Sequence, residues 1–173
     1  QSCTPSDKAS LEIDQLQFFD AVRNGGVLPG NYVTSLLEDS SGTIWVGTYG
    51  YGLAKCVVNK AGELECESFT QQHGLSNNAI YGLLEDKYRN IWISTDFGLS
   101  RLNPETKTFK NYFKQDGLLN NQFYWSAAHK ASDGTLYFGG TEGLNYFQPE
   151  NLTSYAHIAT PKISKLRVHN INI

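Results

Sequence analysis

The hydrophobic positions of this chain fall in short runs that recur three times. Each run centres on an aromatic residue with apolar neighbours, in the stretches "TIWVG", "NIWIS" and "TLYFG", where the aromatic residues are Trp45, Trp92 and Tyr137. A second apolar segment and a polar turn precede each run, and a loop ending in Gly-Leu follows it. The pattern therefore predicts an internal repeat with a period of about 45 residues.

Each repeat unit reads as β structure. No segment keeps apolar residues at helical spacing for long enough to predict a good helix. β-Branched and aromatic residues fill the apolar segments, whereas Gly, Asn, Asp and Ser fill the gaps. In the second unit we expect four strands, at 80–85, 90–95, 98–103 and 108–112. The central "IWI" does not alternate with polar residues, which indicates a strand buried on both faces.

Short strands at this period predict an all-β fold, a partial β-propeller of about three four-stranded blades. We expect the blades at 30–73, 74–116 and 117–155. Residues 1–29 are expected to form an N-terminal segment with the end of a preceding blade. Closed propellers have about 4 to 8 blades, so remaining propeller blades or self-association are the expected partners of these three.

Composition excludes some partner classes. Of the 173 residues, 40% are hydrophobic, which suffices for a core, and the net charge of −3 offers nothing to nucleic acid. The apolar runs are far shorter than the roughly 20 residues that span a bilayer. We therefore expect no nucleic-acid contact, and membrane contact only through regions outside this segment.

The stretch "GLSNNAIYGLLEDKYRNIWISTDFGLSRLNP" and its two counterparts resemble the two-component-regulator propeller repeat. That repeat builds the periplasmic sensor region of hybrid two-component systems of Bacteroidetes, which join a sensor histidine kinase to a response regulator. The final "TPKISKLRVHNINI" resembles the first strand of the β-sandwich that follows such propellers, so a β-sandwich is expected to start at 156–173. The third unit departs from the pattern, because Lys130-Ala131 replaces its Glu-Asp pair.

The resemblance implies a fragment of a periplasmic ligand-sensing domain of an inner-membrane protein. Such a domain would detect a glycan fragment and regulate transcription for polysaccharide utilisation. The segment carries no kinase residues, so enzymatic activity is not expected of it. Two alternatives stay open: a propeller-type lyase or hydrolase acting on polysaccharide, with Asp96, Glu142 and His73 as its only candidates, and a protein-interaction propeller without a small ligand.

Two pairs of neighbouring carboxylates, Glu38-Asp39 and Glu85-Asp86, end the first apolar segment of their units. A catalytic or metal-binding pair is conceivable. Their place in a predicted turn favours another interpretation, in which Asp accepts hydrogen bonds from turn amides. We expect the turn role, because a chemical role repeated in two units and missing from the third is a poor fit.

Cys56 and Cys66 occupy positions that hold apolar residues in the other units, on two strands of one predicted hairpin. A cross-strand disulfide would close a short loop and would indicate an oxidising compartment such as the periplasm. Two buried free thiols are the alternative. Cys3 has no predicted partner.

The loops that join the second to the third strand of a unit, and one unit to the next, should share one face of the propeller. These loops hold aromatic, amide and carboxylate side chains, which suit carbohydrate because sugar C–H faces stack on rings and hydroxyls need polar partners. The candidate ligand-binding residues are Tyr49, Tyr51, Asp96, Phe97, Glu142, His73, Asn77, Asn78, Asn120 and Asn121. The Asn pairs could instead serve the turns. Trp125 is predicted to lie in the core between blades. The histidines lack metal-ligand spacing, so no metal site is expected. No catalytic residue and no cofactor site is expected either.

Overall fold

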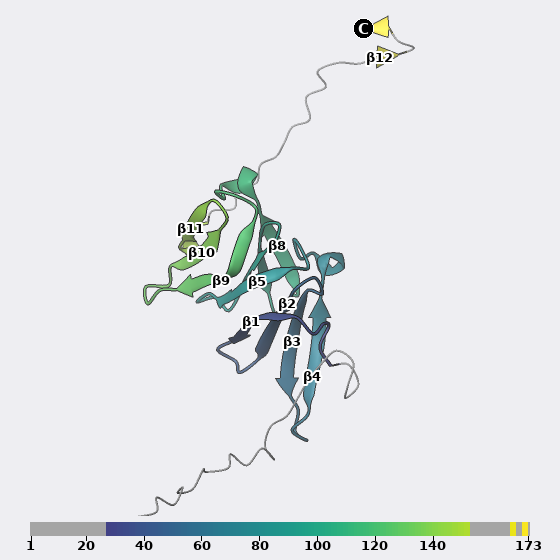
Figure 1. Ribbon diagram of the computed structural model, residues 1–173, viewed down its shortest axis with the longest axis vertical. Coiled ribbons are helices and arrows are strands. Elements are labelled where there is room, and N and C mark those ends of the chain that lie inside the picture. Colours follow the sequence, from purple (N-terminus) through teal and green to yellow (C-terminus); the bar gives the residue numbers. More distant parts are fainter. Residues whose placement is uncertain (1–26, 153–166, 169–170, 173) are drawn as a thin grey trace, which may run out of the picture.

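The computed structural model describes residues 27–152, 167–168 and 171–172. They form an all-β fold whose strands fall into three antiparallel sheets and one short hairpin (Figure 1). The strands of the first sheet are β1 (Val33–Glu38), β2 (Ile44–Thr48), β3 (Leu53–Val58) and β4 (Leu64–Phe69), and those of the second are β5 (Ile80–Glu85), β6 (Ile91–Thr95), β7 (Leu99–Asn103) and β8 (Thr108–Tyr112). The third sheet holds β9 (Phe123–Lys130), β10 (Leu136–Gly140) and β11 (Gly143–Phe147). The hairpin holds β12 (Arg167–Val168) and β13 (Ile171–Asn172). Short 3-10 helices lie at Gln71–His73, Lys114–Asp116 and Pro149–Asn151.

Each of the three sheets is an up-and-down meander in which strand order follows chain order. The four strands expected in the second unit are β5 to β8, with bounds that agree to within one residue. The third sheet has three strands in the described part of the chain, instead of the expected four. The all-β prediction is confirmed. The segments predicted at 1–29 and 156–173 lie almost entirely outside the described residues.

Two hydrophobic clusters fill the spaces between neighbouring sheets, and β6 contributes to both. Ile91 and Ile93 belong to the cluster shared with the first sheet, whereas Trp92 belongs to the cluster shared with the third. Successive side chains of a strand point to opposite faces. Both faces of β6 are therefore covered, and all of its residues are buried. The prediction of a strand buried on both faces is confirmed for β6.

An aspartate after the first strand of a blade organises both the turn and the central tryptophan. Asp86 accepts hydrogen bonds from the backbone amides of Tyr88 (2.8 Å) and Asn90 (2.9 Å) and from the indole Nε1 of Trp92 (2.8 Å). Asp39 makes the same set of bonds, including one from the indole of Trp45 at 2.7 Å. The turn interpretation of the paired carboxylates is thus confirmed for both aspartates.

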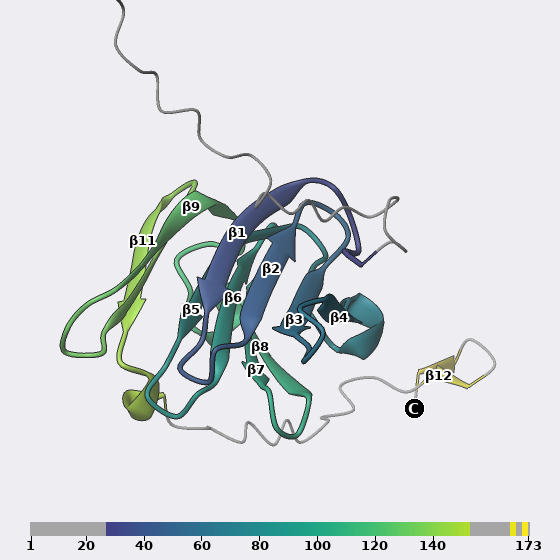
Figure 2. The same ribbon diagram turned by 90° about the horizontal axis from the view of Figure 1, so that it is seen from below.

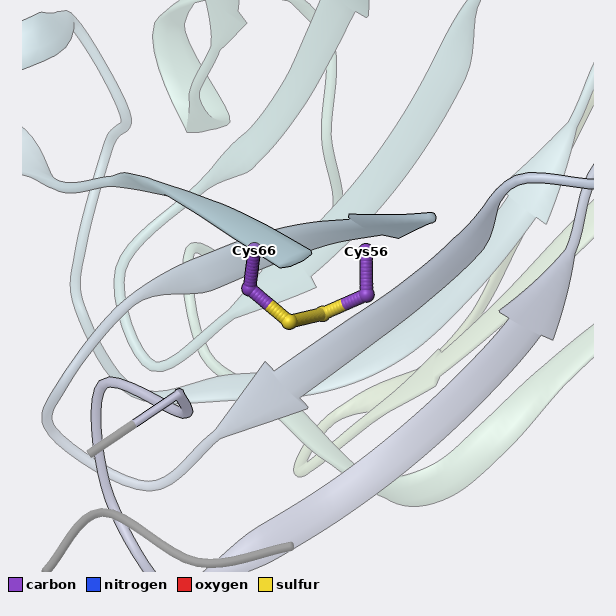
Figure 3. Close-up of a disulfide and its surroundings, with 2 residues drawn as sticks. All are labelled: Cys56 and Cys66. Atoms are coloured by element: carbon purple, nitrogen blue, oxygen red, sulfur yellow. A yellow bond between two sulfur atoms is a disulfide. The ribbon is translucent and has the colours of Figure 1, made fainter. Parts of the chain in front are cut away.

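Cys56 on β3 and Cys66 on β4 are direct cross-strand partners, and a disulfide joins them (Figure 3). Their Cα atoms are 4.1 Å apart, and the Cys56 side chain is buried among Val46 and Ala54. A sequence separation of 10 residues gives a loop whose closure stabilises the fold by about 2.7 kcal/mol in the chain-entropy treatment. The bond holds the outer hairpin of the first blade together.

The first strands of the three blades lie next to one another. β5 neighbours both β1 and β9 (Figure 1, Figure 2), and the three strands surround an open hollow of about 410 Å³. Thr34, Tyr81 and Ser126, one from each strand, are among the residues that line it. The first strands therefore form the inner edge of the array, as expected of propeller blades.

β9 differs from the equivalent strands by an insertion. In the first two blades one residue is bulged out of the pairing, Thr34 in β1 and Tyr81 in β5. In β9 the pairing runs from Phe123↔Gly140 to Ala128↔Phe138, so residues 124–127 oppose the single Gly139. The bulge of the third blade is thus two residues longer than that of the others.

Candidate functional site

The predicted loop face exists because the loops of neighbouring blades bond to each other. The backbone N–H groups of Gly50 and Gly52 donate to the carbonyl of Asn78 in the loop that enters the next blade. One blade further on, Gly98 donates in the same way to the carbonyl of Asn121, at 2.7 Å. Each β2–β3-type loop therefore rests on the entry loop of its neighbour, and their side chains share one face.

The asparagine pairs in the entry loops are engaged with the backbone. Asn77 Oδ1 accepts from the amide of Ala79 (2.8 Å), and Asn78 Oδ1 accepts from the amide of Gln71 (2.8 Å). Asn121 Oδ1 accepts in the same way from Lys114, at 2.6 Å. These acceptors serve the turns, and a ligand role for the pairs stays a prediction.

Asn120 holds the entry loop of the third blade against the loop that follows β10. Its Oδ1 accepts from the amide of Asn121 (2.6 Å), and its Nδ2 donates to the hydroxyl of Thr141 (2.9 Å). Glu142 follows Thr141 in the loop between β10 and β11, where it is exposed. Asn120 therefore has both a structural role and a place beside a candidate carboxylate.

His73 caps its own 3-10 helix. Its Nδ1 accepts a hydrogen bond from the backbone amide of Thr70 at 3.0 Å, and its ring lies edge-on against Phe69. In the next blade Asp116 fills the same place and accepts from the amide of Phe113 at 2.8 Å. A residue that can be replaced by aspartate at the equivalent position serves the local turn.

Two of the candidate aromatic residues pack against residues outside their own loops while keeping exposed surface. Phe97 lies against Phe113, with ring centroids 5.6 Å apart. Tyr51 covers Gly30 so closely that a Cβ atom there would clash with the ring. Both side chains are about half exposed, so each keeps part of its surface available to a ligand.

Tyr49 and Asp96 belong to a cluster that draws on all three blades. The ring centroids of Tyr49 and Trp125 are 5.7 Å apart, and those of Tyr81 and Trp125 are 6.0 Å apart in a stacked arrangement. Asp96 Oδ1 accepts from the hydroxyl of Tyr81 (2.9 Å) and from Nε2 of Gln122 (3.1 Å). We call Tyr49, Tyr81, Asp96, Gln122 and Trp125 the aromatic cluster.

The electrostatics of the cluster fix Tyr81 as a hydrogen-bond donor. Burial, together with the hydrogen bond to Asp96 and the charge of that carboxylate, raises the pKa of Tyr81 from 10.0 to about 12. The hydroxyl is therefore protonated at neutral pH and keeps donating to Asp96. The carboxylate is in turn held in one orientation.

The prediction that Trp125 lies in the core is wrong. Its side chain is 54% exposed, whereas Phe123, at 1%, fills the core position of the third blade. The prediction aligned Trp125 with Val33 and Ile80 by counting back from the central aromatic residue. The register instead places Phe123 opposite Gly140, as Ile80 lies opposite Thr95, because the longer bulge absorbs two residues.

Sequence reasoning also missed Tyr81 as a member of the cluster. The misplacement of Trp125 did have a usable signal, because the segment before "TLYFG" is longer than its counterparts in the other units.

In the described residues, no group of three His, Cys, Asp or Glu side chains could hold a metal ion. None of the helices in this part of the chain has the length and apolar character needed to cross a membrane.

Comparison with known proteins finds a repeat family that two segments of this chain resemble. Residues 27–50 and 74–97 match the sequence profile described as two component regulator propeller. Histidine kinase P4 of Formosa agariphila is 32% identical over 103 residues, which are 60% of this chain and 8% of that protein.

Solved structures with this fold include extracellular domains assigned to hybrid two-component systems of B. thetaiotaomicron. One superposes with a TM-score of 0.61 at 20% identity, over 77% of this chain and 18% of that one. Another has a TM-score of 0.50 at 24% identity, over 78% of this chain and 24% of that one. The chain thus spans only a minor part of each of these proteins. Residues 27–50 and 74–97 are thus similar to two-component-regulator propeller repeats.

Proposed function

We propose that this chain is part of the extracellular sensor region of a hybrid two-component system and that its loop face binds a glycan fragment. The tandem repeats of a two-component-regulator family, and the fold shared with extracellular domains of such systems, support the sensor role. The disulfide supports a periplasmic location, because disulfides persist in oxidising compartments. The membrane anchor and the kinase would lie in regions outside this chain.

The observation that carries the ligand class is the aromatic cluster on the loop face. Tyr49 and Trp125 are about half exposed and lie side by side. A carboxylate and an amide, those of Asp96 and Gln122, stand next to them. Rings stack on the C–H faces of sugars while carboxylates and amides bind hydroxyl groups, so this combination suits an oligosaccharide.

A sensor must convert binding into a change of state. A glycan can do so only if it binds one arrangement of the sensor more tightly than another. The loop face is suited to this because its cluster draws on three blades, so a ligand that reaches Tyr49, Asp96 and Trp125 contacts all three blades. We propose that ligand binding favours one packing of the blades and of whatever domain follows them.

An enzyme of propeller architecture is less well supported. His73 uses Nδ1 for the amide of Thr70, and Asp96 Oδ1 already accepts two hydrogen bonds. General acid–base chemistry needs such a group within reach of the reacting proton. Glu142 is the remaining candidate, and it lies in a different loop.

Thermal unfolding of the full chain with a panel of oligosaccharides tests the proposal. A glycan present at about 100 times its Kd should stabilise the fold by about 2.7 kcal/mol, which raises Tm by several degrees. The matching monosaccharides serve as a control for non-specific solute effects. If no oligosaccharide changes Tm while the chain unfolds cooperatively, the glycan proposal fails and a protein partner becomes the better interpretation.

A further inference from the structure

We infer that the two-residue insertion in β9 builds the ligand platform of this chain: Trp125, with Tyr49 beside it, stacks on one neutral sugar ring, and Asp96 with Gln122 binds hydroxyl groups of that ring. The inference rests on the proposed function and specifies its site and its preferred ligand. Trp125 thereby becomes the principal specificity-determining residue of the chain.

Trp125 does not fill the buried core position of its blade. Phe123 fills the core position, and the other two tryptophans, Trp45 and Trp92, are fully buried, whereas Trp125 is 54% exposed. Large aromatic side chains are normally buried because of the apolar area that they carry. An inserted and exposed tryptophan that packs against two tyrosines, stacked on Tyr81 and tilted against Tyr49, is therefore better explained by a ligand than by the fold.

The backbone beside Trp125 is held in an unfavourable conformation. Ser126 has φ 54°, in the left-handed region that residues other than Gly, Asn and Asp rarely occupy. It also lines the hollow between the inner strands, next to Tyr81. Such conformations cluster at functional sites, where the surrounding structure enforces them. Here the strained bulge places the indole against Tyr49 and Tyr81.

The carboxylate beside the rings is ordered in advance. Tyr81 and Gln122 both donate to Oδ1 of Asp96, and none of the described residues donates to Oδ2. Oδ2 can therefore accept from a sugar hydroxyl without any reorientation of the side chain. An acceptor that is already fixed loses little entropy on binding, which favours affinity and specificity.

The charge of the cluster selects among sugars. Asp96 is its only charged member, and no lysine or arginine contacts the rings of Tyr49 and Trp125 through a described cation–π pair. A uronic acid would bring a second carboxylate next to Asp96, and like charges brought together disfavour binding. The site should therefore prefer neutral hexose or pentose units over uronic acids.

Tryptophan fluorescence reports on this site directly, because Trp125 is exposed while Trp45 and Trp92 are fully buried. The probes are tetrasaccharides of glucose, mannose, xylose and galacturonic acid, added to the full chain. A neutral tetrasaccharide that binds should shift the emission to shorter wavelength and protect the acrylamide-accessible component, which belongs to Trp125. Binding of a neutral tetrasaccharide without any such protection would overturn the inference.

Substitutions then separate the site from the fold. Isothermal titration should show that Trp125→Ala weakens binding of the same tetrasaccharide by roughly 30-fold, as expected for a central aromatic anchor. Trp125→Phe should retain binding to within about tenfold, and Asp96→Asn should reduce the preference for neutral over uronic sugars. Tyr88→Ala is the matched control: Tyr88 is 58% exposed in the turn between β5 and β6, away from the loop face. Equal Tm values establish that the variants fold.

The outcomes distinguish the two proposals. If a neutral glycan binds and Trp125→Ala leaves the affinity unchanged, the platform lies elsewhere and the glycan-sensor proposal stands. A galacturonic tetrasaccharide that binds more tightly than the neutral ones would refute the charge argument. If none of the probes binds, the glycan proposal fails, and this inference fails with it.

Discussion

Asp86 gives the sharpest test of how a blade is held together. Its side chain is 3% exposed and accepts hydrogen bonds from the indole of Trp92 and from two turn amides. Asp86→Ala removes these acceptors and leaves the indole N–H of a fully buried tryptophan without a partner. A lost hydrogen bond to a charged group costs about 1.5–3 kcal/mol, and a buried unsatisfied donor about 1–3 kcal/mol. We expect the free energy of unfolding to fall by about 4 kcal/mol.

Urea unfolding followed by tryptophan emission measures this loss. Asp133→Ala is the control, because Asp133 lies in the corresponding turn of the third blade, where its side chain accepts a hydrogen bond from the backbone amide of Thr135 at 2.9 Å and no indole N–H replaces that of Trp92. It should cost less than about 1 kcal/mol. Asp86→Asn keeps one carbonyl acceptor and should fall between the two, which preserves a readout if the alanine variant does not fold. Equal losses for Asp86→Ala and Asp133→Ala would refute the claim that the buried indole bond is the dominant contribution.

Three further predictions concern the disulfide and two titrating groups. Reduction of Cys56–Cys66 should lower the free energy of unfolding by about 2.7 kcal/mol; thiol counting that finds both cysteines free in the native, oxidised protein would contradict this. The pKa of Asp39 lies below its ordinary 3.8, because hydrogen bonds in its turn outweigh the upward effect of burial. The stability that Asp39 contributes is therefore present above the unfolded-state pKa and is lost as pH falls through the lower folded value, so Asp39→Asn should flatten the acid limb of the stability profile. The pKa of Tyr81 is raised from 10.0 to about 12 by burial and by Asp96, so its contribution to stability is present below the unfolded-state pKa and is lost as pH rises through the folded-state value of about 12. Burial raises the pKa of Tyr112 too, so spectrophotometric titration should show late-titrating tyrosines, and Tyr81→Phe should remove one of them.

The repeat made much of the fold predictable. Because several copies share one pattern, the strands of the second blade could be bounded to within one residue. The same equivalence placed Cys56 and Cys66 on facing strands, where the structure pairs them directly. The arrangement of the loops followed from the meander, since alternate turns of an up-and-down sheet must lie at the same end.

The chemistry of the loop face was less predictable, because side-chain roles there depend on which backbone groups need partners. Asn77 and Asn78 satisfy turn amides, and His73 caps a 3-10 helix. These demands become visible only once the loop conformation is known. Trp125 was misplaced because a fixed spacing was assumed, and a bulge can absorb extra residues without disturbing the pairing on either side.

The repeat also indicates where function can vary. Positions with the same task in more than one blade, such as the aspartate that binds the central indole, are constrained by the turn and by the core. The bulge of the first strand is different, because its residues are released from the ladder and face the hollow between the inner strands. Thr34, Tyr81 and the segment containing Trp125 occupy this same position in successive blades, with three different side-chain chemistries. A position that tolerates such change without loss of the fold is where a propeller can acquire a ligand site, and the longest bulge carries the most exposed ring of the cluster.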